Sequence, residues 1–295
     1  MTDNSNSEKA SSTAGYTCFS RACATREKDE RYRGPDDMAE IFLPTFAKII
    51  LNVPVLRKAF IGKIAPSGIY EYVIARTKLL DEIFLDALVR QVRHIVLLGA
   101  GMDTRAIRFA NRNQGTKIIE LDIEKTQRPK IEILKRKQVK LPNELVFASI
   151  DFNEQSLSDV LVEAGYQNGQ QSLFLWEGVT MYLNPEAVDD TLSFIRDSSQ
   201  SGSQVVFDYI YSSVLRRENS LYGEKEIFDT VSRTGEGWTF GIENGQIDEF
   251  LTERGFKLTA HYSPADLESK YFQKSDGNLV RRINGTHCIV QSVVV

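Results

Sequence analysis

Short apolar runs alternate with helical patterns through the middle of this chain. Runs typical of buried strands occupy residues 94–98, 117–121, 145–150, 172–176 and 203–210. Between them, apolar residues at helical spacing predict helices near residues 104–113, 124–138, 156–164 and 186–199. Parallel strands need crossover connections, and each crossover helix must cover a face of the sheet. The alternation therefore predicts an α/β fold with a doubly wound sheet.

The pattern changes after residue 211. Residues 212–241 carry charges, glycines and aromatic residues without a strand period, and we expect a lid-like insertion there on the substrate side. A helical pattern near residues 243–254 is followed by two strand-like runs at 256–262 and 286–294. Two consecutive strands at the end of such a series predict an antiparallel C-terminal hairpin, which gives a mostly parallel sheet of seven strands.

The region before the first strand reads as helical. Residues 1–15 are polar and rich in serine, and we expect a disordered tail. Residues 36–61 show helical spacing interrupted by Pro44 and Pro54, which predicts two or three short helices, and we assign residues 16–68 to a helical cap. Residues 69–89 form one broad apolar stripe, so a long helix should pack beside the first strand. Because no second boundary is evident, we interpret residues 16–295 as one domain.

Composition excludes several kinds of partner. The net charge of -4 argues against a nucleic-acid surface. The three cysteines show neither paired spacing nor an even number, which favours free thiols in a reducing compartment. The first residues lack the basic and apolar regions of a signal peptide, and no apolar run approaches the roughly 20 residues of a membrane helix. We therefore expect a cytoplasmic protein without a membrane partner.

Two glycines and a carboxylate indicate a nucleoside cofactor. Gly99 and Gly101 end the first strand, where they allow a tight turn and a close approach of ligand to backbone. Asp122 ends the second strand, where its carboxylate can accept hydrogen bonds from both ribose hydroxyls. Glu120 is the alternative because it shares that face of the strand, but it lies deeper in the sheet. We favour Asp122.

The glycine pattern also discriminates between cofactors. A dinucleotide fingerprint needs a third glycine, whereas Thr104 stands in that place beside Asp103. A carboxylate there would repel a diphosphate, but it suits a cationic ligand. S-adenosylmethionine, with its sulfonium and ammonium groups, fits best, and the backbone N–H groups of Gly99 and Gly101 should face its methionine end. An NAD-dependent oxidoreductase on a similar sheet is the alternative.

Several motifs occur in one order over roughly residues 20–294. They are Ala75-Arg76-Thr77, Leu98 to Arg105, Glu120-Leu121-Asp122, Ser149 to Phe152, Trp176 to Leu183, Phe207-Asp208-Tyr209, and the tail from Phe240-Gly241 to Gly255-Phe256. With these motifs the chain resembles the leucine carboxyl methyltransferase family, in particular its bacterial branch of S-adenosylmethionine-dependent, polyketide-type O-methyltransferases. The resemblance implies a class I methyltransferase-like, Rossmann-like sheet, bound S-adenosylmethionine, and methyl transfer to a carboxylate or hydroxyl oxygen.

The resemblance also implies roles for individual residues. Arg76 should pair with the cofactor carboxylate, and Glu177, at the end of the fourth strand, should face the ammonium group. Asp151 should accept the adenine amino group, with the backbone N–H of Phe152 reaching a ring nitrogen. Arg105 is expected either to brace the glycine loop or to bind the cofactor carboxylate.

The expected substrate is a small molecule that carries a carboxylate or hydroxyl, such as a polyketide-type metabolite. Methylation of a protein C-terminal carboxyl group is one alternative, and a cofactor-binding regulatory protein without transfer activity is another. A carboxylate acceptor is ionised near pH 7, so its methylation needs no general base. The sequence therefore assigns no catalytic residue. Tyr182 and Arg26 are candidates for positioning the substrate. His94, His261 and His287 fall in or at the ends of strands, so we expect packing roles and no metal site.

Overall fold

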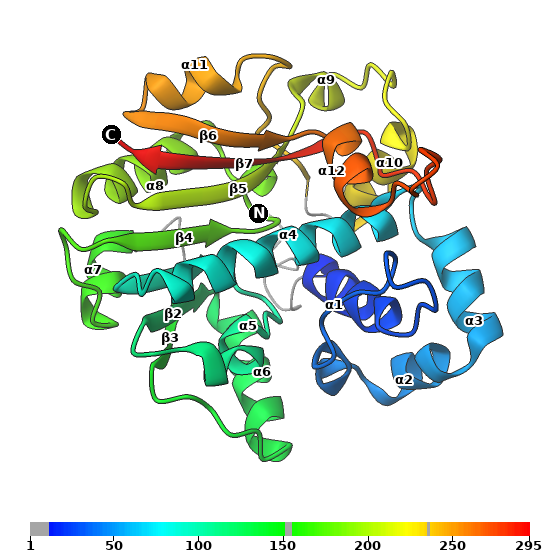
Figure 1. Ribbon diagram of the computed structural model, residues 1–295, viewed down its shortest axis with the longest axis horizontal. Helices are drawn as coiled ribbons and strands as arrows, with labels where there is room; N and C mark the ends of the chain where they lie inside the picture. The colour runs from blue at the N-terminus through cyan, green and yellow to red at the C-terminus, as the bar shows by residue number, and fades with distance from the viewer. Residues whose placement is uncertain (1–11, 151–154, 235–236) are drawn as a thin grey trace, which may run out of the picture.

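A seven-stranded sheet forms the centre of the computed structural model, which describes residues 12–150, 155–234 and 237–295 (Figure 1). The strand order is β3-β2-β1-β4-β5-β7-β6. The strands are β1 (His94–Leu98), β2 (Lys117–Asp122), β3 (Leu145–Ser149), β4 (Ser172–Trp176), β5 (Gln204–Ile210), β6 (Phe256–Tyr262) and β7 (His287–Val294). Strands β1 to β5 pair in parallel, and β7 runs antiparallel to both β5 and β6. The predicted mostly parallel sheet with an antiparallel C-terminal hairpin is confirmed.

Helices cover both faces of this sheet. The α-helices are α1 (Ser12–Ala24), α2 (Thr45–Asn52), α3 (Pro54–Ala59), α4 (Ile69–Val89), α5 (Arg105–Arg108), α6 (Glu124–Arg136), α7 (Leu157–Glu163), α8 (Pro185–Ser198), α9 (Ser212–Leu215), α10 (Glu224–Thr234), α11 (Ile247–Thr252) and α12 (Pro264–Tyr271). Shorter turns are η2 (Ala39–Phe42), η3 (Phe60–Ile64), η4 (Ala110–Arg112) and η5 (Thr180–Tyr182). Figure 1 shows α4 running across one face, with α1 to α3 grouped near its N-terminal end.

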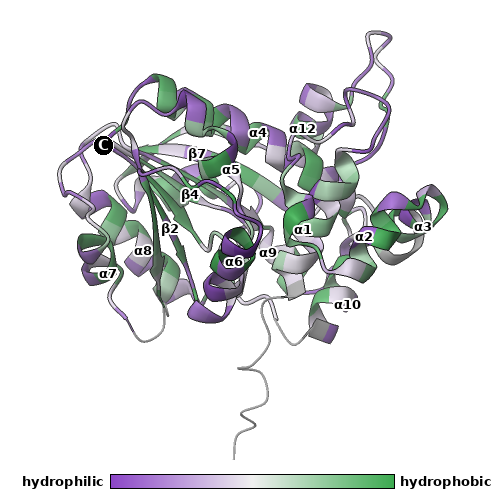
Figure 2. Ribbon diagram, turned by 90° about the horizontal axis from the view of Figure 1, so that it is seen from below, coloured by the Kyte–Doolittle hydropathy of each residue, from purple (hydrophilic) through white to green (hydrophobic). Residues whose placement is uncertain are grey.

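The strands are apolar throughout because both of their faces are buried. In β1, Ile95 and Leu97 pack with α1, α2 and α4, whereas Val96 and Leu98 pack on the opposite face with α7, α8 and α11. Figure 2 shows the hydrophobic strands enclosed by helices with hydrophilic outer faces. This two-sided burial is the reason that a central parallel strand reads as a continuous apolar run rather than an alternating one.

The strand register brings several loops to one edge. Leu98 lies opposite Leu121 of β2 and Trp176 of β4, so the three strands end level with one another. Strand β7 runs in the opposite direction and begins at the edge where the parallel strands end, because its first residue, His287, pairs with Ile210 at the end of β5. The carboxyl ends of β1, β2, β4 and β5 and the first residue of β7 therefore share this edge.

The N-terminal region partly differs from expectation. Residues 1–11 lie outside the described residues, but residues 12–15, assigned above to a disordered tail, form the first turn of α1. Helix α1 buries Cys18, Phe19 and Cys23 in the core. This burial stabilises the helix, and its polar first turn continues it. The short helices α2 and α3 and the long helix α4 lie where the sequence predicts them. All three cysteines are free and buried.

The segment at residues 212–241 contains α9 and α10. Ile227 and Val231 of α10 pack against Ile69 and Val73 at the start of α4. The insertion thus lies over the same sheet edge as α1. In the described part of the chain, no helix has the combination of length and apolar character that a bilayer crossing requires.

Candidate functional site

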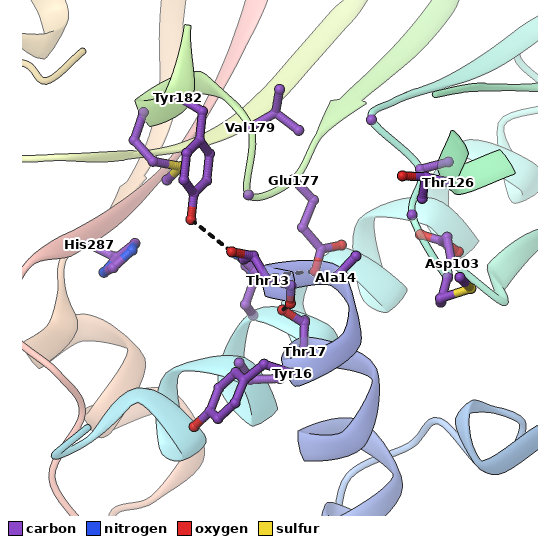
Figure 3. Close-up of a pocket in the computed structure, with 18 of the residues that line it drawn as sticks. Thr13, Ala14, Tyr16, Thr17, Asp103, Thr126, Glu177, Val179, Tyr182 and His287 are labelled. Atoms are coloured by element: carbon purple, nitrogen blue, oxygen red, sulfur yellow. Dashed lines mark hydrogen bonds and ion pairs between the residues drawn. The ribbon is translucent and has the colours of Figure 1, made fainter. Parts of the chain in front are cut away.

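A cavity of about 640 Å³ lies at the carboxyl edge of the sheet (Figure 3). Its walls come from the loops after β1 and β4, the end of β2, helices α1 and α4, and α10 with the segment that follows it. The volume falls within the range of small-molecule sites, and an open α/β sheet binds its ligands at this edge. We therefore treat the cavity as the candidate functional site.

The turn after β1 needs glycine at two positions. Gly99 has a φ of 68° and Gly101 a φ of 51°, the left-handed region in which other residues are strained. A Cβ atom on Gly99 would also lie 2.4 Å from Cγ2 of Val179, in the loop after β4. Both glycines line the cavity. The glycines thus leave the backbone of this turn without side chains, and the close packing of Val179 on Gly99 requires glycine at that position.

Asp122 lines the cavity at the end of β2. Its Oδ2 accepts a hydrogen bond from Gly101 N at 2.5 Å, and its Oδ1 accepts one from Ile123 N at 2.8 Å. Burial raises the pKa of Asp122, and these two backbone donors act against that shift. Each carboxylate oxygen keeps a further lone pair, so the group is oriented and can still accept ligand hydroxyls.

Glu120, the alternative ribose ligand, does not line the cavity. Its side chain is buried and forms an ion pair with Lys130 of α6. Burial raises the pKa of Glu120 to about 7, although Lys130 lowers it. The glutamate is therefore a structural partner of a lysine, and Asp122 is the carboxylate that reaches the cavity.

Glu177 lies between two arginines at the centre of the cavity. Its Oε1 is 2.9 Å from Nε of Arg76, and its Oε2 is 2.8 Å from Nη1 of Arg105. Burial alone would raise the pKa of Glu177, but Arg105, Arg76 and Arg21 together lower it to about 2. The carboxylate is therefore charged at every physiological pH.

Arg76 extends from α4 to the same point. Its Nη1 lies 2.5 Å from Oδ2 of Asp208. The same Oδ2 accepts a hydrogen bond from the Tyr72 hydroxyl, and Oδ1 of Asp208 accepts one from Gly178 N. Burial acts to lower the pKa of Arg76, but Glu177 and Asp208 raise it overall. Arg76 and Glu177 thus present a cation and an anion side by side, which suits the carboxylate and ammonium of an amino-acid group.

Arg105 braces the loop after β1. It pairs with Asp103, with Asp81 of α4 and with Glu177, and its side chain is fully buried. Asp103 Oδ1 also accepts a hydrogen bond from Arg105 N at 2.7 Å, which fixes the turn that leads into α5. Arg105 therefore neutralises the acidic loop that was expected to favour a cation. Among the described residues, Glu177 and Asp122 are the other carboxylates that line the cavity.

Tyr182 reaches the cavity as predicted, but Arg26 does not. The hydroxyl of Tyr182 lies 3.3 Å from Oγ1 of Thr13 in α1 (Figure 3). Arg26 lies just beyond the end of α1, faces solvent and pairs with Glu40 at 2.6 Å, so its positioning role is not supported. Arg21, about one turn earlier, lines the cavity instead. It pairs with Asp36 at 3.0 Å and donates to the backbone oxygen of Met102 at 2.7 Å.

The predicted adenine ligands Asp151 and Phe152 lie outside the described residues. Their assignment stays a prediction. Within the described ranges, no group of three or more histidine, cysteine, aspartate or glutamate side chains is arranged to hold a metal ion.

His287 is a cavity residue that the sequence analysis missed. It was assigned a packing role, yet it lines the cavity at the start of β7, next to Trp238. Burial lowers the pKa of His287 to about 4. No sequence signal separates it from His94 and His261, neither of which lines the cavity. Only the antiparallel direction of β7 brings its first residue to this edge.

Comparison with known proteins bears on the chemistry of the cavity. The family model described as leucine carboxyl methyltransferase matches residues 14–196. The Bacillus subtilis (strain 168) protein named "Putative S-adenosyl-L-methionine-dependent methyltransferase YktD" is 25% identical over 206 residues, 70% of this chain and 67% of that protein. A protein of Streptomyces coelicolor with the same class of name is 34% identical over 133 residues, 45% of this chain and 46% of its own length. The match thus spans less than half of the Streptomyces protein.

Among solved structures, the magnesium protoporphyrin IX methyltransferase of Synechocystis PCC 6803 with bound SAM aligns over 85% of this chain and 96% of that chain. The TM-score is 0.46 and the sequence identity 10%.

Proposed function

The chain belongs to the leucine carboxyl methyltransferase family, and from that premise we propose that it is an S-adenosylmethionine-dependent O-methyltransferase. It transfers a methyl group to a carboxylate or hydroxyl oxygen of a small molecule, such as a polyketide-type metabolite. One observation carries the proposal: a single cavity combines the glycine turn of β1, the carboxylate of Asp122 and the Arg76–Glu177 pair. The glycine turn lets a ligand approach the backbone, Asp122 can accept ribose hydroxyls, and the Arg76–Glu177 pair can bind an amino-acid group of the same ligand.

The residues of the cavity fit S-adenosylmethionine. Asp122 would accept the ribose hydroxyls, Arg76 would bind the carboxylate, and Glu177 would bind the ammonium group. Gly99 presents bare backbone to the cavity, and a Cβ there would also overlap with Val179. When bound, the cofactor supplies a methyl group activated by the positive charge on sulfur.

The contribution of the chain to transfer is mainly orientation. The cavity is large enough to hold the methyl-bearing part of the cofactor beside the acceptor, so that the two reacting groups are held close together and aligned. Transfer to an oxygen forms an O–C bond as the S–C bond breaks. A carboxylate acceptor is already ionised near pH 7, whereas a hydroxyl must lose its proton.

Binding and turnover together test this function. Calorimetry with the full chain is expected to detect S-adenosylmethionine and S-adenosylhomocysteine but not NADH. Incubation with methyl-labelled cofactor and a small-molecule extract should give one labelled metabolite and S-adenosylhomocysteine. A labelled peptide ending in leucine would instead indicate a protein C-terminal methyltransferase. Cofactor binding without any acceptor would indicate a regulatory protein, and binding of NADH alone would refute the proposal.

Asp122→Ala tests the ribose site. Removing a desolvated carboxylate that accepts ligand hydroxyls should weaken S-adenosylmethionine binding by about 1.5–3 kcal/mol, measured by calorimetry. Glu120→Gln is the matched control, because Glu120 lies on the same strand but pairs with Lys130. The control should lower the free energy of unfolding and leave cofactor affinity within about twofold. Unchanged affinity in Asp122→Ala would refute the assignment.

A further inference from the structure

The cavity has two chemically different ends. Gly101 and Asp122 lie at one end, whereas Tyr182, Trp238 and His287 line the other, together with apolar side chains of α4 and α10. Figure 3 places Tyr182 and His287 across the cavity from Asp103 and Thr126, with Glu177 between them. If the cofactor occupies the end with Asp122 and its amino-acid group reaches Glu177, the aromatic end remains for the acceptor.

The aromatic end offers little to an anionic acceptor. Among the described residues that line the cavity, the cationic side chains are Arg21, Arg76 and Arg105. Arg21 is paired with Asp36, and Arg105 with Asp81 and Asp103, while the proposed function assigns Arg76 to the carboxylate of the cofactor. Burying a carboxylate without an unpaired cation is unfavourable. A neutral, mainly apolar acceptor fits this end better.

A chain of hydrogen bonds sets the proton position on His287. Asn284 Nδ2 donates to the backbone oxygen of Ser67 at 2.8 Å, which fixes the orientation of the amide. Asn284 Oδ1 must then accept the hydroxyl proton of Thr286, whose Oγ1 lies 2.6 Å away. Thr286 Oγ1 is 2.7 Å from Nδ1 of His287. Having donated its only proton, that oxygen accepts a hydrogen bond from Nδ1–H.

The neutral imidazole therefore carries its lone pair on Nε2. No described residue forms a hydrogen bond with Nε2. The ring is held in place by Tyr72, at a centroid distance of 4.7 Å, and by the edge-on ring of Trp238 at 5.4 Å. The charged groups nearby are Asp208 of β5 and Arg76 of α4. Burial lowers the pKa of His287 to about 4, with Asp208 acting to raise it and Arg76 to lower it, so the ring is neutral at pH 7.

We propose that His287 is a catalytic residue whose Nε2 takes the proton from a hydroxyl group of an apolar acceptor, a phenol or an enol, while that oxygen is methylated. The inference rests on the proposed function and narrows its acceptor class to hydroxyls. The O–CH3 bond forms as the S–CH3 bond breaks, and the electron pair of the broken bond remains on sulfur. The proton passes from the hydroxyl oxygen to Nε2 and leaves later to water.

The tautomer can be tested without turnover. Nitrogen-15 NMR of the protein saturated with S-adenosylhomocysteine should show His287 protonated at Nδ1 and bare at Nε2 near pH 7. Thr286→Val removes the acceptor for Nδ1–H, and the same spectrum should then show loss of this preference. A wild-type ring protonated at Nε2 overturns the proposal, because it would have no lone pair for the acceptor proton.

Kinetics test the role in proton transfer. The acceptors are simple phenols that are neutral at the assay pH, nitrophenols that are ionised there, and aromatic carboxylates. Wild-type protein should form S-adenosylhomocysteine with phenols. His287→Gln should lose about 100-fold or more of kcat/KM on neutral phenols and less than about 10-fold on ionised ones. His261→Gln is the control: it sits on β6, bonds Tyr209 and does not line the cavity, so it should retain activity on both.

The outcomes separate this inference from the function on which it rests. An equal loss on neutral and ionised phenols would mean that His287 supports the structure only, and would overturn the inference. Transfer to carboxylates alone, with normal cofactor binding, would also overturn it while the methyltransferase proposal stands. A wild-type protein that does not bind S-adenosylmethionine would overturn both. In His287→Gln, cofactor affinity measured by calorimetry should stay within about twofold, as expected for a residue at the acceptor end.

Discussion

At the scale of single residues, the site depends on opposite charges held at close range in a buried place. Glu177 contacts Arg76 and Arg105, and these arginines also pair with Asp208, Asp103 and Asp81. Burying any one of these charges alone would be costly, so the network is stable only when its members neutralise one another. The same network keeps Glu177 ionised, because its arginines lower the pKa of the carboxylate.

Glu177→Gln should therefore reduce stability in a pH-dependent way. The folded-state pKa of about 2 lies below the ordinary value of 4.5, so the carboxylate stabilises the fold above pH 4.5 and loses that effect as the pH falls toward 2. We expect Gln to cost about 3 kcal/mol at pH 7, from the size of the shift. The difference from wild type should shrink at pH 3, measured by urea unfolding.

Glu132→Gln serves as the control for this prediction. Glu132 forms an exposed ion pair with Arg128 on α6, and such pairs contribute about 0.5 kcal/mol or less. Its effect should be small at both pH values. A stability difference for Glu177→Gln that does not change between pH 7 and pH 3 would contradict the account of the charge network.

At the scale of elements, the β1 turn joins the sheet to the cavity. Gly99 and Gly101 both adopt left-handed backbone, but they differ in surroundings. A Cβ at Gly99 would meet Val179 at 2.4 Å, whereas at Gly101 the nearest atom is Ala14 Cβ at 3.6 Å. The turn after β1 thus packs against the loop after β4 at Gly99 but not at Gly101.

Gly99→Ala should destabilise the fold more than Gly101→Ala. The left-handed backbone costs each variant about 1–2 kcal/mol, and Gly99→Ala adds the overlap with Val179. Adding Val179→Ala should restore part of the loss in Gly99→Ala and none in Gly101→Ala, measured as the free energy of unfolding. Equal losses in the two single variants, or equal effects of Val179→Ala on both, would show that the overlap is not the cause.

Most elements could be predicted from the sequence because their patterns are local. All seven strands and the helices α4, α6, α7 and α8 lie within a few residues of the predicted ranges. The helix predicted at residues 104–113 is instead divided into α5 and η4. The first turn of α1 was missed, since its polar sequence gives no sign that the rest of the helix is buried.

At the scale of the whole molecule, α1 and α10 close the cavity over the sheet edge. Thr13 of α1 lies against Tyr182, and α10 rests on the start of α4 through Ile227 and Val231. Helix α10 thus packs outside the central core, whereas α1 also packs on the core through Cys18, Phe19 and Cys23 and reaches the cavity with its first turns. A ligand between them and the sheet should stabilise their positions.

Hydrogen exchange should report this closure. Binding of S-adenosylhomocysteine is expected to slow exchange in α1 and α10, measured by mass spectrometry of peptides from the two helices. Peptides from α7 and α11, which pack on the opposite face, are the internal control and should change little. Uniform slowing across all four helices would indicate general stabilisation, and no change in α1 and α10 would contradict their role in closure.

The sequence by itself determined the sheet class and most of the cofactor end of the cavity. Apolar runs and the residues that end them are local features, so Gly99, Gly101, Asp122 and Glu177 come together once the strands are parallel and end level. Only the tertiary structure decided the far end. That Arg21 rather than Arg26 reaches the cavity depends on how α1 packs and where it ends. That His287 faces the cavity depends on the reversed direction of β7, a pairing between segments distant in the chain that no local pattern encodes.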